Sequence, residues 1–589
     1  MTMDGTRFMR ILVLVVLAMA SGCVMPEGVG SDSLDRYQRA LVDRGPQTRG
    51  QEGLDPLRPA LGSTGPAMRI TKDPQTGKSQ LSLTLDEALV RAMTNDLEIR
   101  TVAFTPSINR QDMEKAAAEF DYVVFGGFNY RKDDKRTLSQ IQLDPNAVFD
   151  NFNALTRTYQ AGIKNKTVTG ATCALSYTLT DTWDNSTYYK INRRFEPVLA
   201  LDVTQPLLRN AWPEYNLAQL KLAGVNYHSS MAAFRQKVEE VATKVINAYW
   251  TLVQARGELK IQQDLLKYTQ TTLERVRARS ELDATAVQIK QIEAAAESRR
   301  ATLIQAEKTI LDAQDQLAHL LNDADINVVS DLEIVPVTEP VTTPVAIDLT
   351  DKLLTALRHN PILEQARLAV DAADIGIRIA ANQALPKLDL TASASLQGMG
   401  TTANASEENM ETGDYASYGL GLTGEYPLGN RAAEADLRRQ KLTRLQNLTQ
   451  MQYAADSVAL DVKERIRQIG SSHEEMQAQN AAMEAAWVQL RALEDTERIR
   501  GQLTPEFLQV KLSAQEAVAN SARQKLAAIV QFNGALADLD RATGTTLDVH
   551  RLKVALVPAT EGDYWPQPSH AAPSPMTTPT SLPSPEADR

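Results

Sequence analysis

The chain has 589 residues, more than one ordinary globular domain needs, so several domains or one extended architecture are expected. Its 62 Lys and Arg residues are outnumbered by 73 Asp and Glu residues, and the net charge of -11 excludes a general nucleic-acid binder, which needs basic patches. With 2 Cys and 6 His residues, neither a disulfide framework nor an obvious metal cluster is expected, and we expect no other cofactor. A mean hydropathy of -0.30 excludes a polytopic helical membrane protein.

The N-terminus has the pattern of a bacterial export signal. Two arginines precede an apolar run over residues 11–20, which is too short to cross a bilayer permanently but suits a signal-peptide core. The run ends in Ala-Ser-Gly-Cys, which resembles a lipobox and predicts removal of residues 1–22 and lipidation of Cys23. Ordinary signal-peptidase cleavage is the alternative. The same resemblance implies a lipid anchor in the outer membrane and not in the inner one, because Val24 and not aspartate follows the cysteine.

Helix-stopping segments divide the rest of the chain. Residues 23–80 are rich in Gly, Pro, Asp and Arg, and residues 546–589 end in a Pro/Ser/Thr-rich tail, so both are expected to be flexible tethers. Residues 325–348 contain prolines among Val and Thr and are expected to form an extended linker. This linker separates two patterned halves, residues 81–324 and 349–545.

The two halves repeat each other. Residues 85–96 align without gaps with residues 349–360, at an offset of 264 positions, and both have Leu and Ala at helical spacing. Each half continues through an Ala-rich helix into segments where apolar and polar residues alternate, such as residues 388–396 and 175–179. Such strands have one apolar and one polar face, as a water-filled membrane barrel requires. A half-exposed sheet over a soluble core has the same alternation and stays open as the alternative.

Long helices are expected beyond two matching prolines, Pro206 and Pro427, which we interpret as strand-to-helix exits. No proline occurs in residues 214–335 or 428–504, and a helix of about 65 residues is ~100 Å long. The 4-3 spacing of a coiled-coil seam is followed by Phe234, Val238, Val241, Val245, Ala248, Leu252, Ala255 and Leu259. A turn in each half makes it a long helical hairpin. Because one chain offers too few partners to cover these apolar stripes, we expect oligomerisation.

In this order and in duplicate, the features resemble the TolC-type outer-membrane efflux proteins over roughly residues 81–545. The resemblance rests on the two helix openings, the strand exits Thr-Gln-Pro-Leu-Leu-Arg and Tyr-Pro-Leu-Gly, and the closing Ala-Thr-Gly at residues 542–544. It implies a mainly α protein with a membrane β-barrel, built from a duplicated helix, strand, strand and long helical hairpin. It also implies a homotrimer, in which each chain gives four strands to a twelve-stranded barrel and its helices to an α-helical tunnel. Residues 131–170 are extra in the first half, and both a large extracellular loop and an added hairpin stay open.

The resemblance implies a passive outer-membrane conduit that works with a periplasmic adaptor and an inner-membrane pump or ABC transporter. No Gly-rich phosphate loop, His pair at ligand spacing or nucleophile beside a base is found, so we expect no enzymatic activity. The alternative is a non-conducting lipoprotein whose coiled coil tethers the layers of the envelope. A tether has no use for amphipathic strands at matching positions in both repeats, which favours the conduit.

The turns of the two helical hairpins are the predicted functional sites. In the family these turns form the periplasmic mouth, so the resemblance implies that Glu281, Asp283 and Glu506 line a pore constriction. Repeated carboxylates there attract cations and repel anions. Solvated helix tips are the alternative for these three residues. The residues expected to contact the adaptor are Gly501, Leu503 and Thr504.

Overall fold

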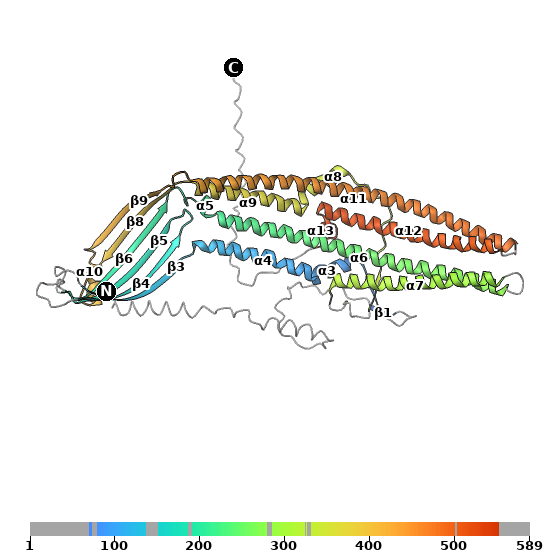
Figure 1. The fold of residues 1–589 in the computed structure, drawn as a ribbon, viewed down its shortest axis with the longest axis horizontal. Helices are drawn as coiled ribbons and strands as arrows, with labels where there is room; N and C mark the ends of the chain where they lie inside the picture. Colours follow the sequence, from blue (N-terminus) through green and yellow to red (C-terminus); the bar gives the residue numbers. More distant parts are fainter. Residues whose placement is uncertain are drawn as a thin grey trace, which may run out of the picture.

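An antiparallel sheet and a set of long helices lie end to end in the chain (Figure 1). The computed structural model describes residues 70–72, 79–136, 151–186, 191–279, 285–323, 326, 332–500 and 504–552. The first half contributes the helices α3 (Leu85–Asn95), α4 (Leu97–Ala117), α6 (Ala218–Ala278) and α7 (Ala286–Leu321). The second half contributes α8 (Leu349–His359), α9 (Pro361–Gln383), α11 (Arg431–Arg500) and α12 (Pro505–Thr543). The short helices are η1 (Ala118–Phe120), α5 (Pro213–Asn216), α10 (Ala403–Glu411) and α13 (Thr546–Val549).

The two halves start their helices in the same way. The Thr84 side chain accepts a hydrogen bond from the Glu87 N–H at 3.2 Å, and the Glu87 carboxylate accepts one from the Thr84 N–H at 3.0 Å. Asp348 takes the place of Thr84 in the second half and accepts bonds from the first turn of α8. Both caps satisfy N–H groups that a helix cannot satisfy within itself, so they fix where each repeat begins.

The sheet has six antiparallel strands in the order β3-β4-β5-β6-β8-β9. The first half provides β3 (Val123–Arg136), β4 (Asn151–Lys166), β5 (Thr172–Asp184) and β6 (Arg193–Pro206), and the second half provides β8 (Lys387–Gln397) and β9 (Ala416–Glu425). The expectation of four strands per chain is therefore wrong, and so is the order helix, strand, strand for the first repeat. Residues 131–170 contribute to an added hairpin. Alternation in β4 is hard to recognise in the sequence because Arg157 interrupts the apolar face.

A tight turn joins the added strands β4 and β5 at the helix end of the sheet. Within it the Thr167 N–H donates a hydrogen bond to the Ala171 carbonyl at 2.7 Å, and Gly170 has a φ of 92°. A Cβ at Gly170 would lie 2.4 Å from the Asn210 carbonyl oxygen, so only glycine fits. Because this turn returns the chain to the helix end, β3 still follows a helix and β6 still precedes one.

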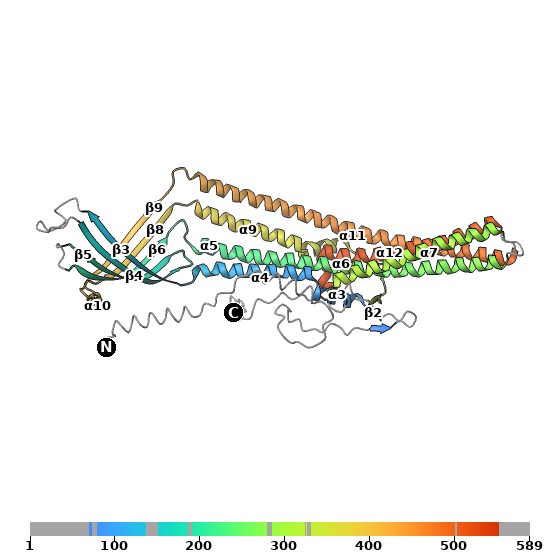
Figure 2. The ribbon, with the colours of Figure 1, turned by 60° about the horizontal axis from the view of Figure 1, so that its bottom comes forward.

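Four helices lie side by side next to the sheet, in the order α4-α6-α9-α11 (Figures 1 and 2). Farther from the sheet, α6 packs against α7 and α11 packs against α12, which are the two predicted helical hairpins. The seam residues Val241, Val245 and Leu252 are 0% exposed, in a core shared with α3, α4 and α7. The expectation that these stripes need a partner chain is therefore wrong, because shorter helices of the same chain cover them.

A second, small sheet ties the segment between the repeats to the first repeat. It contains β1 (Ile70–Lys72), β2 (Ser79–Leu83) and β7 (Glu333–Pro336), with β7 parallel to β2. The hydroxyl of Tyr249 in α6 donates to the Leu83 carbonyl at 3.1 Å and accepts from the Val337 N–H at 3.0 Å. The small sheet is thus held against the middle of α6.

Candidate functional site

The large sheet has one apolar and one mainly polar face. A row of directly paired residues that crosses all six strands is Tyr418, Ala394, Leu201, Leu175, Ile163 and Val124. The neighbouring row, on the opposite face, is Ser417, Ser395, Ala200, Ser176, Gly162 and Phe125. Because successive side chains of a strand point to opposite faces, the predicted alternation becomes a continuous apolar surface on one side of the sheet.

Charged residues end the apolar surface at the side far from the long helices. There Asp181 of β5 forms ion pairs with Arg157 of β4 at 3.4 Å and with Arg193 of β6 at 3.1 Å. Near the same end, the Tyr177 hydroxyl donates to the Glu407 carboxylate of α10 at 3.0 Å. The apolar surface is therefore a band with a polar border.

The two sides of the chain that run parallel to its long axis are exposed. The edge strand β9 leaves Tyr418 and Leu420 at 92% and 81% exposure. The helices next to the two edge strands carry exposed apolar side chains on a single face each. In α4 these include Leu97, Phe104 and Ile108, and in α11 they include Leu442, Tyr453 and Leu460. Both sides of the chain, α4 with β3 and β9 with α11, thus present unpaired backbone and apolar side chains together.

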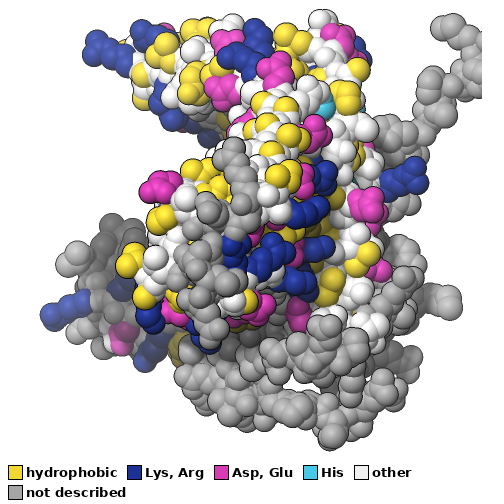
Figure 3. Space-filling model, turned by 90° about the vertical axis from the view of Figure 1, so that its right-hand side faces the viewer, with side chains coloured by type: hydrophobic (Ala, Val, Ile, Leu, Met, Phe, Trp, Pro, Cys, Tyr) yellow, Lys and Arg dark blue, Asp and Glu magenta, His cyan; other side chains and the backbone are white. Residues whose placement is uncertain are grey.

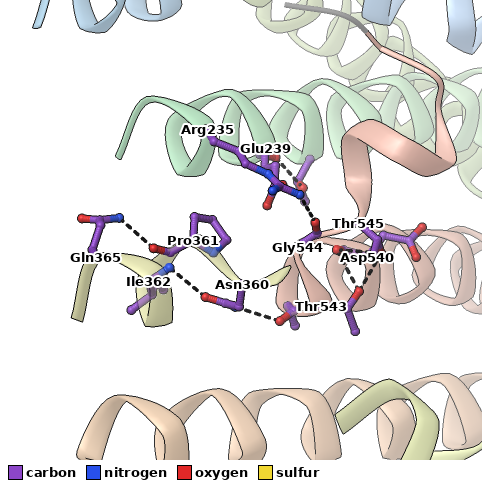
Figure 4. A network of polar contacts seen from close by, with 12 residues as sticks. Arg235, Glu239, Asn360, Pro361, Ile362, Gln365, Asp540, Thr543, Gly544 and Thr545 are labelled. Atoms are coloured by element: carbon purple, nitrogen blue, oxygen red, sulfur yellow. Dashed lines mark hydrogen bonds and ion pairs between the residues drawn. The ribbon is translucent and has the colours of Figure 1, made fainter. Parts of the chain in front are cut away.

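A polar network joins the two repeats halfway along the helices (Figure 4). The Asn360 side chain, at the start of α9, donates to the Ala542 carbonyl at 2.9 Å and accepts from the Ile362 N–H at 2.9 Å. The Arg235 guanidinium of α6 donates to the Gly544 carbonyl at 2.7 Å. Both contacts use carbonyl groups at the C-terminal end of α12, which has no intrahelical partner for them.

Two carboxyl groups near this junction are removed from solvent, Glu239 fully and Asp540 in part. Burial raises the pKa of Glu239 to about 7, although Arg235 lies 3.1 Å away and acts in the opposite direction. Burial also raises the pKa of Asp540 to about 6. The junction therefore contains groups that change charge near neutral pH.

Buried polar contacts join the first hairpin to α12 closer to the helical turns. The Arg299 guanidinium of α7 donates to Gln515 of α12 at 3.2 Å and to the Leu512 carbonyl at 3.1 Å, and it also contacts Thr269 of α6. Gln515 in turn donates to the Thr272 hydroxyl at 3.2 Å. Burial lowers the pKa of Arg299. An apolar cluster lies beyond these contacts and consists of Leu273, Val276, Ile292, Leu508 and Leu512.

The predicted site residues are only partly within the described part of the chain. Those that lie outside it are Cys23, Glu281, Asp283, Gly501 and Leu503. Thr504 caps α12 by accepting a bond from the Phe507 N–H at 3.2 Å, and Glu506 is exposed in the first turn of α12. A carboxylate in that position is favoured by the helix dipole. Pro206 is the last residue of β6, and Pro427 lies just beyond β9.

The helix ends that flank the hairpin turns carry basic as well as acidic side chains. The last turn of α6 contains Arg275 and Arg277, and Arg277 pairs with Glu293 of α7 at 2.7 Å. Figure 3, which views this end of the molecule, shows Lys and Arg side chains beside Asp and Glu side chains. The described residues at this end therefore form a surface of mixed charge and not a uniformly acidic one.

The Arg299 contacts and the Arg235–Glu239 pair were not predicted from the sequence. A signal for Arg299 exists in the sequence, because α7 also has apolar residues at 4-3 spacing and Arg299 lies four positions before the first of them. These residues are Leu303, Ala306, Ile310, Ala313 and Leu317. Glu239 is next to the seam residue Val238 in the sequence, so the 4-3 spacing does not include it. It is buried because α12 packs against α6, which the sequence does not reveal. No helix among the described residues is long and apolar enough to cross a membrane. No group of His, Cys, Asp and Glu side chains in the described ranges could hold a metal ion.

Comparison with known proteins identifies the fold. No protein-family model matches the chain, and no curated protein matches it. Among solved structures, the outer-membrane channel OprN matches with a TM-score of 0.58 and 14% identity, over 78% of this chain and 90% of OprN. The CmeC outer membrane channel of Campylobacter jejuni matches with a TM-score of 0.56 and 11% identity, over 78% and 86%. VceC from Vibrio cholerae matches with 0.55 and 16% identity, over 78% and 96%. The chain therefore has the fold of the TolC-type outer-membrane channels that its sequence resembles.

Proposed function

We propose that the protein is the outer-membrane channel of a tripartite efflux or secretion system, a passive trimeric conduit from periplasm to exterior. The observation that carries this proposal is the position of the two-faced sheet at the end of long helices. A sheet with an apolar outer band and a polar inner face suits a water-filled barrel in a membrane, and the helices suit a tunnel that continues it. A tether between envelope layers would leave the apolar band without a role.

The exposed sides of the chain support assembly by copies of itself. One side consists of α4 and β3 and the other of β9 and α11, so contact between unlike sides produces a ring when the rotation closes. Assembly would cover the apolar faces of α4 and α11 and pair the edge strands, which otherwise invite aggregation. Three copies are what the family resemblance implies.

The remaining functional assignments follow from the resemblance. In this proposal Cys23 carries the lipid anchor in the outer membrane. The turns at Gly501, Leu503 and Thr504 contact a periplasmic adaptor, which connects the tunnel to an inner-membrane pump or ABC transporter. Residues Glu281, Asp283 and Glu506 form the constriction at the periplasmic mouth.

A matched pair of variants in β9 tests the proposal. Leu420 lies in the apolar band, and Thr423 lies on the opposite face of the same strand. Leu420→Asp places a carboxylate in the membrane at a cost of about 1–3 kcal/mol per copy, whereas Thr423→Asp places it in the aqueous lumen. We expect the first variant to lose membrane insertion and channel activity in planar bilayers while keeping its helix content by circular dichroism. The second should insert and conduct.

Light scattering of the purified wild-type protein in detergent checks the assembly. We expect a trimer that conducts ions when it is added to a planar bilayer. A monomer in detergent, or a trimer that never conducts, contradicts the proposed conduit. Equal insertion of the two β9 variants contradicts the assignment of the apolar band to the membrane.

A further inference from the structure

The junction between the two repeats is a template for a junction between two copies. Within the chain, β6 and α6 lie at one side of the first repeat and pack against β8 and α9 of the second. At the corresponding side of the second repeat lie β9 and α11, and at the opposite side of the first repeat lie α4 and β3. In the described part of the chain these four elements have no neighbour on their outer sides.

On the basis of the proposed trimer, we infer that β9 of each copy pairs with β3 of the next as β6 pairs with β8, closing a ring of eighteen strands. The directions of the strands permit this ring. All neighbouring strands of the sheet are antiparallel, and each copy contributes an even number of them, so β9 and the next β3 are also antiparallel. The pore is then wider than the twelve-stranded barrel that the resemblance implies.

The repeat itself supplies the register of this pairing. Pro427 corresponds to Pro206 at the strand exits, and the offset of 264 positions makes Val123, the first residue of β3, correspond to Lys387, the first residue of β8. In the template, Leu201 pairs with Ala394. The corresponding pair between copies is Leu422 with Tyr130.

The faces of the two strands agree with this register. Leu422 lies on the apolar face of β9, because it is four positions from Tyr418. Tyr130 lies on the apolar face of β3, because it is six positions from Val124. A register displaced by one residue would have placed the two side chains on opposite faces. The apolar band therefore continues unbroken from one copy to the next.

The width of the helical layer also fits six strands per copy. Four helices packed about 8–10 Å apart span ~32–40 Å. Six strands spaced ~4.8 Å apart and tilted by ~40° span ~38 Å along the rim of a barrel, whereas four strands span only ~25 Å. An eighteen-stranded barrel thus continues the tunnel without narrowing, and at equal tilt it is about 1.5 times as wide as a twelve-stranded one.

Cysteine cross-linking tests the register directly. In a Cys173→Ala background that keeps Cys23, the variant Leu422→Cys with Tyr130→Cys puts two thiols opposite each other. Directly paired residues of antiparallel strands have Cα atoms about 4.5–5.5 Å apart, which is within disulfide range. Because each copy carries both cysteines, oxidation should yield covalent trimers on a non-reducing gel. The control, Leu422→Cys with Arg131→Cys, has its thiols on opposite faces and should yield far fewer.

The outcomes separate this inference from the proposed trimer. A trimer by light scattering that forms no Leu422–Tyr130 disulfide overturns the eighteen-stranded ring and leaves the conduit in place. Cross-linking of Leu422→Cys to Leu179→Cys in β5 would likewise overturn it, because β5 would then be the edge of a four-stranded contribution. A monomer would overturn the proposed function together with the ring.

A second variant tests the width. Replacing residues 137–192 by Asn-Gly, which favours a two-residue hairpin turn, joins β3 to β6 and leaves four strands per copy. Electron-microscopic projections of trimers in lipid nanodiscs should show a wild-type barrel about 1.5 times as wide as that of the variant. Equal widths would show that the added strands lie outside the ring and overturn the inference.

Discussion

Helices α6 and α11 occupy equivalent places in the two repeats but have different surroundings. Val241 of α6 and Val462 of α11 lie equally far beyond Pro206 and Pro427, and both are 0% exposed. Ala232 of α6 is 3% exposed, whereas Tyr453, at the corresponding position of α11, is 76% exposed. Likewise Glu239 is 1% exposed and Leu460 is 54% exposed.

The difference between the two helices comes from their neighbours. Helix α6 has a neighbouring helix on each side, α4 on one and α9 on the other. Helix α11 has α9 on one side, and on its other side the described residues provide no helix. The exposed face of α11 is the face that α6 buries against the other repeat. The comparison therefore supports the proposal that this exposed face of α11 meets a neighbouring copy, and it predicts different effects for mutations on the two faces.

The largest effect is expected at the face that both helices bury. Val241→Asp and Val462→Asp each place a charge among apolar neighbours, at a cost of several kcal/mol unless it is paired. Both variants should fail to fold or melt far below the wild type, and to a similar extent. Thermal unfolding followed by circular dichroism in detergent measures this. A clear difference between the two variants would show that the repeats are not equivalent at this position.

An intermediate effect is expected at the face that only α6 buries. Leu460→Asp puts a charge where the proposed neighbouring copy packs, so the trimer should dissociate at least tenfold more readily, which corresponds to about 1.4 kcal/mol. Secondary structure and the fold of the single chain should remain, because Leu460 is exposed there. Analytical ultracentrifugation in detergent measures the assembly.

The control for this variant is Gln450→Asp. Gln450 is also exposed on α11, but it lies roughly a quarter turn away from Leu460. It should leave the trimer intact. Equal dissociation of the two variants would place the contact between copies elsewhere on α11.

The sequence predicted the repeated helical frame because its signals are local. Helix caps, the 4-3 seam and the prolines at the strand exits act over a few residues and recur at fixed offsets. The six strands were not predicted, because Arg157 interrupts the alternation in β4 and four strands were taken from the resemblance. The partners of the seam were not predicted either, because a periodic pattern marks a buried face without naming the helix that covers it.

The candidate site was less predictable than the fold for a related reason. Arg299 and Gln515 are far apart in the chain and gain their roles only when α7 and α12 pack together. Glu239 is one charged residue among several in a helix, and its sequence neighbours do not reveal that α12 ends above it. Thr504 caps α12 at the second hairpin turn, but its predicted contact with an adaptor and the predicted roles of the other turn residues remain predictions.

A smaller effect, dependent on pH, is expected from Glu239. Its pKa in the folded chain is about 7, raised from an ordinary value of 4.5 by burial, so the folded state binds more protons than the unfolded state between these values. The free energy of unfolding should therefore decrease as the pH rises from about 4.5 to about 7. Asp540, with a pKa raised from 3.8 to about 6, contributes in the same direction at lower pH.

Replacing Glu239 by glutamine tests this assignment. Glu239→Gln resembles the protonated form, so its melting temperature should change less between pH 5.5 and pH 8 than that of the wild type. Adding Asp540→Asn should remove part of the dependence that remains below about pH 6. Leu460→Gln, at the equivalent position of α11, does not change the number of titrating groups and should keep the wild-type slope. An unchanged slope in Glu239→Gln would show that Glu239 is ionised throughout this range.

The smallest effect on structure is expected from mutations at the hairpin turns. There the carboxylates of the first repeat can be neutralised separately from the carboxylate of the second. If Glu281, Asp283 and Glu506 line the periplasmic mouth, neutralising them should lower the preference of the channel for cations without changing assembly. The double variant Glu281→Gln with Asp283→Asn removes six carboxylates from a trimer, and Glu506→Gln removes three, so the first should shift the reversal potential more. Salt should reduce both shifts, because exposed charges are screened within ~8–10 Å at physiological ionic strength.

Bilayer recordings under a salt gradient measure the shifts, and reversal potentials equal to the wild type in both variants would assign these carboxylates to solvated helix tips. If the reversal potential shifts in only one of the two variants, the carboxylates of a single repeat line the mouth. The two repeats would then differ at this end of the molecule, as they already differ at the other end, where only the first repeat has the added strands.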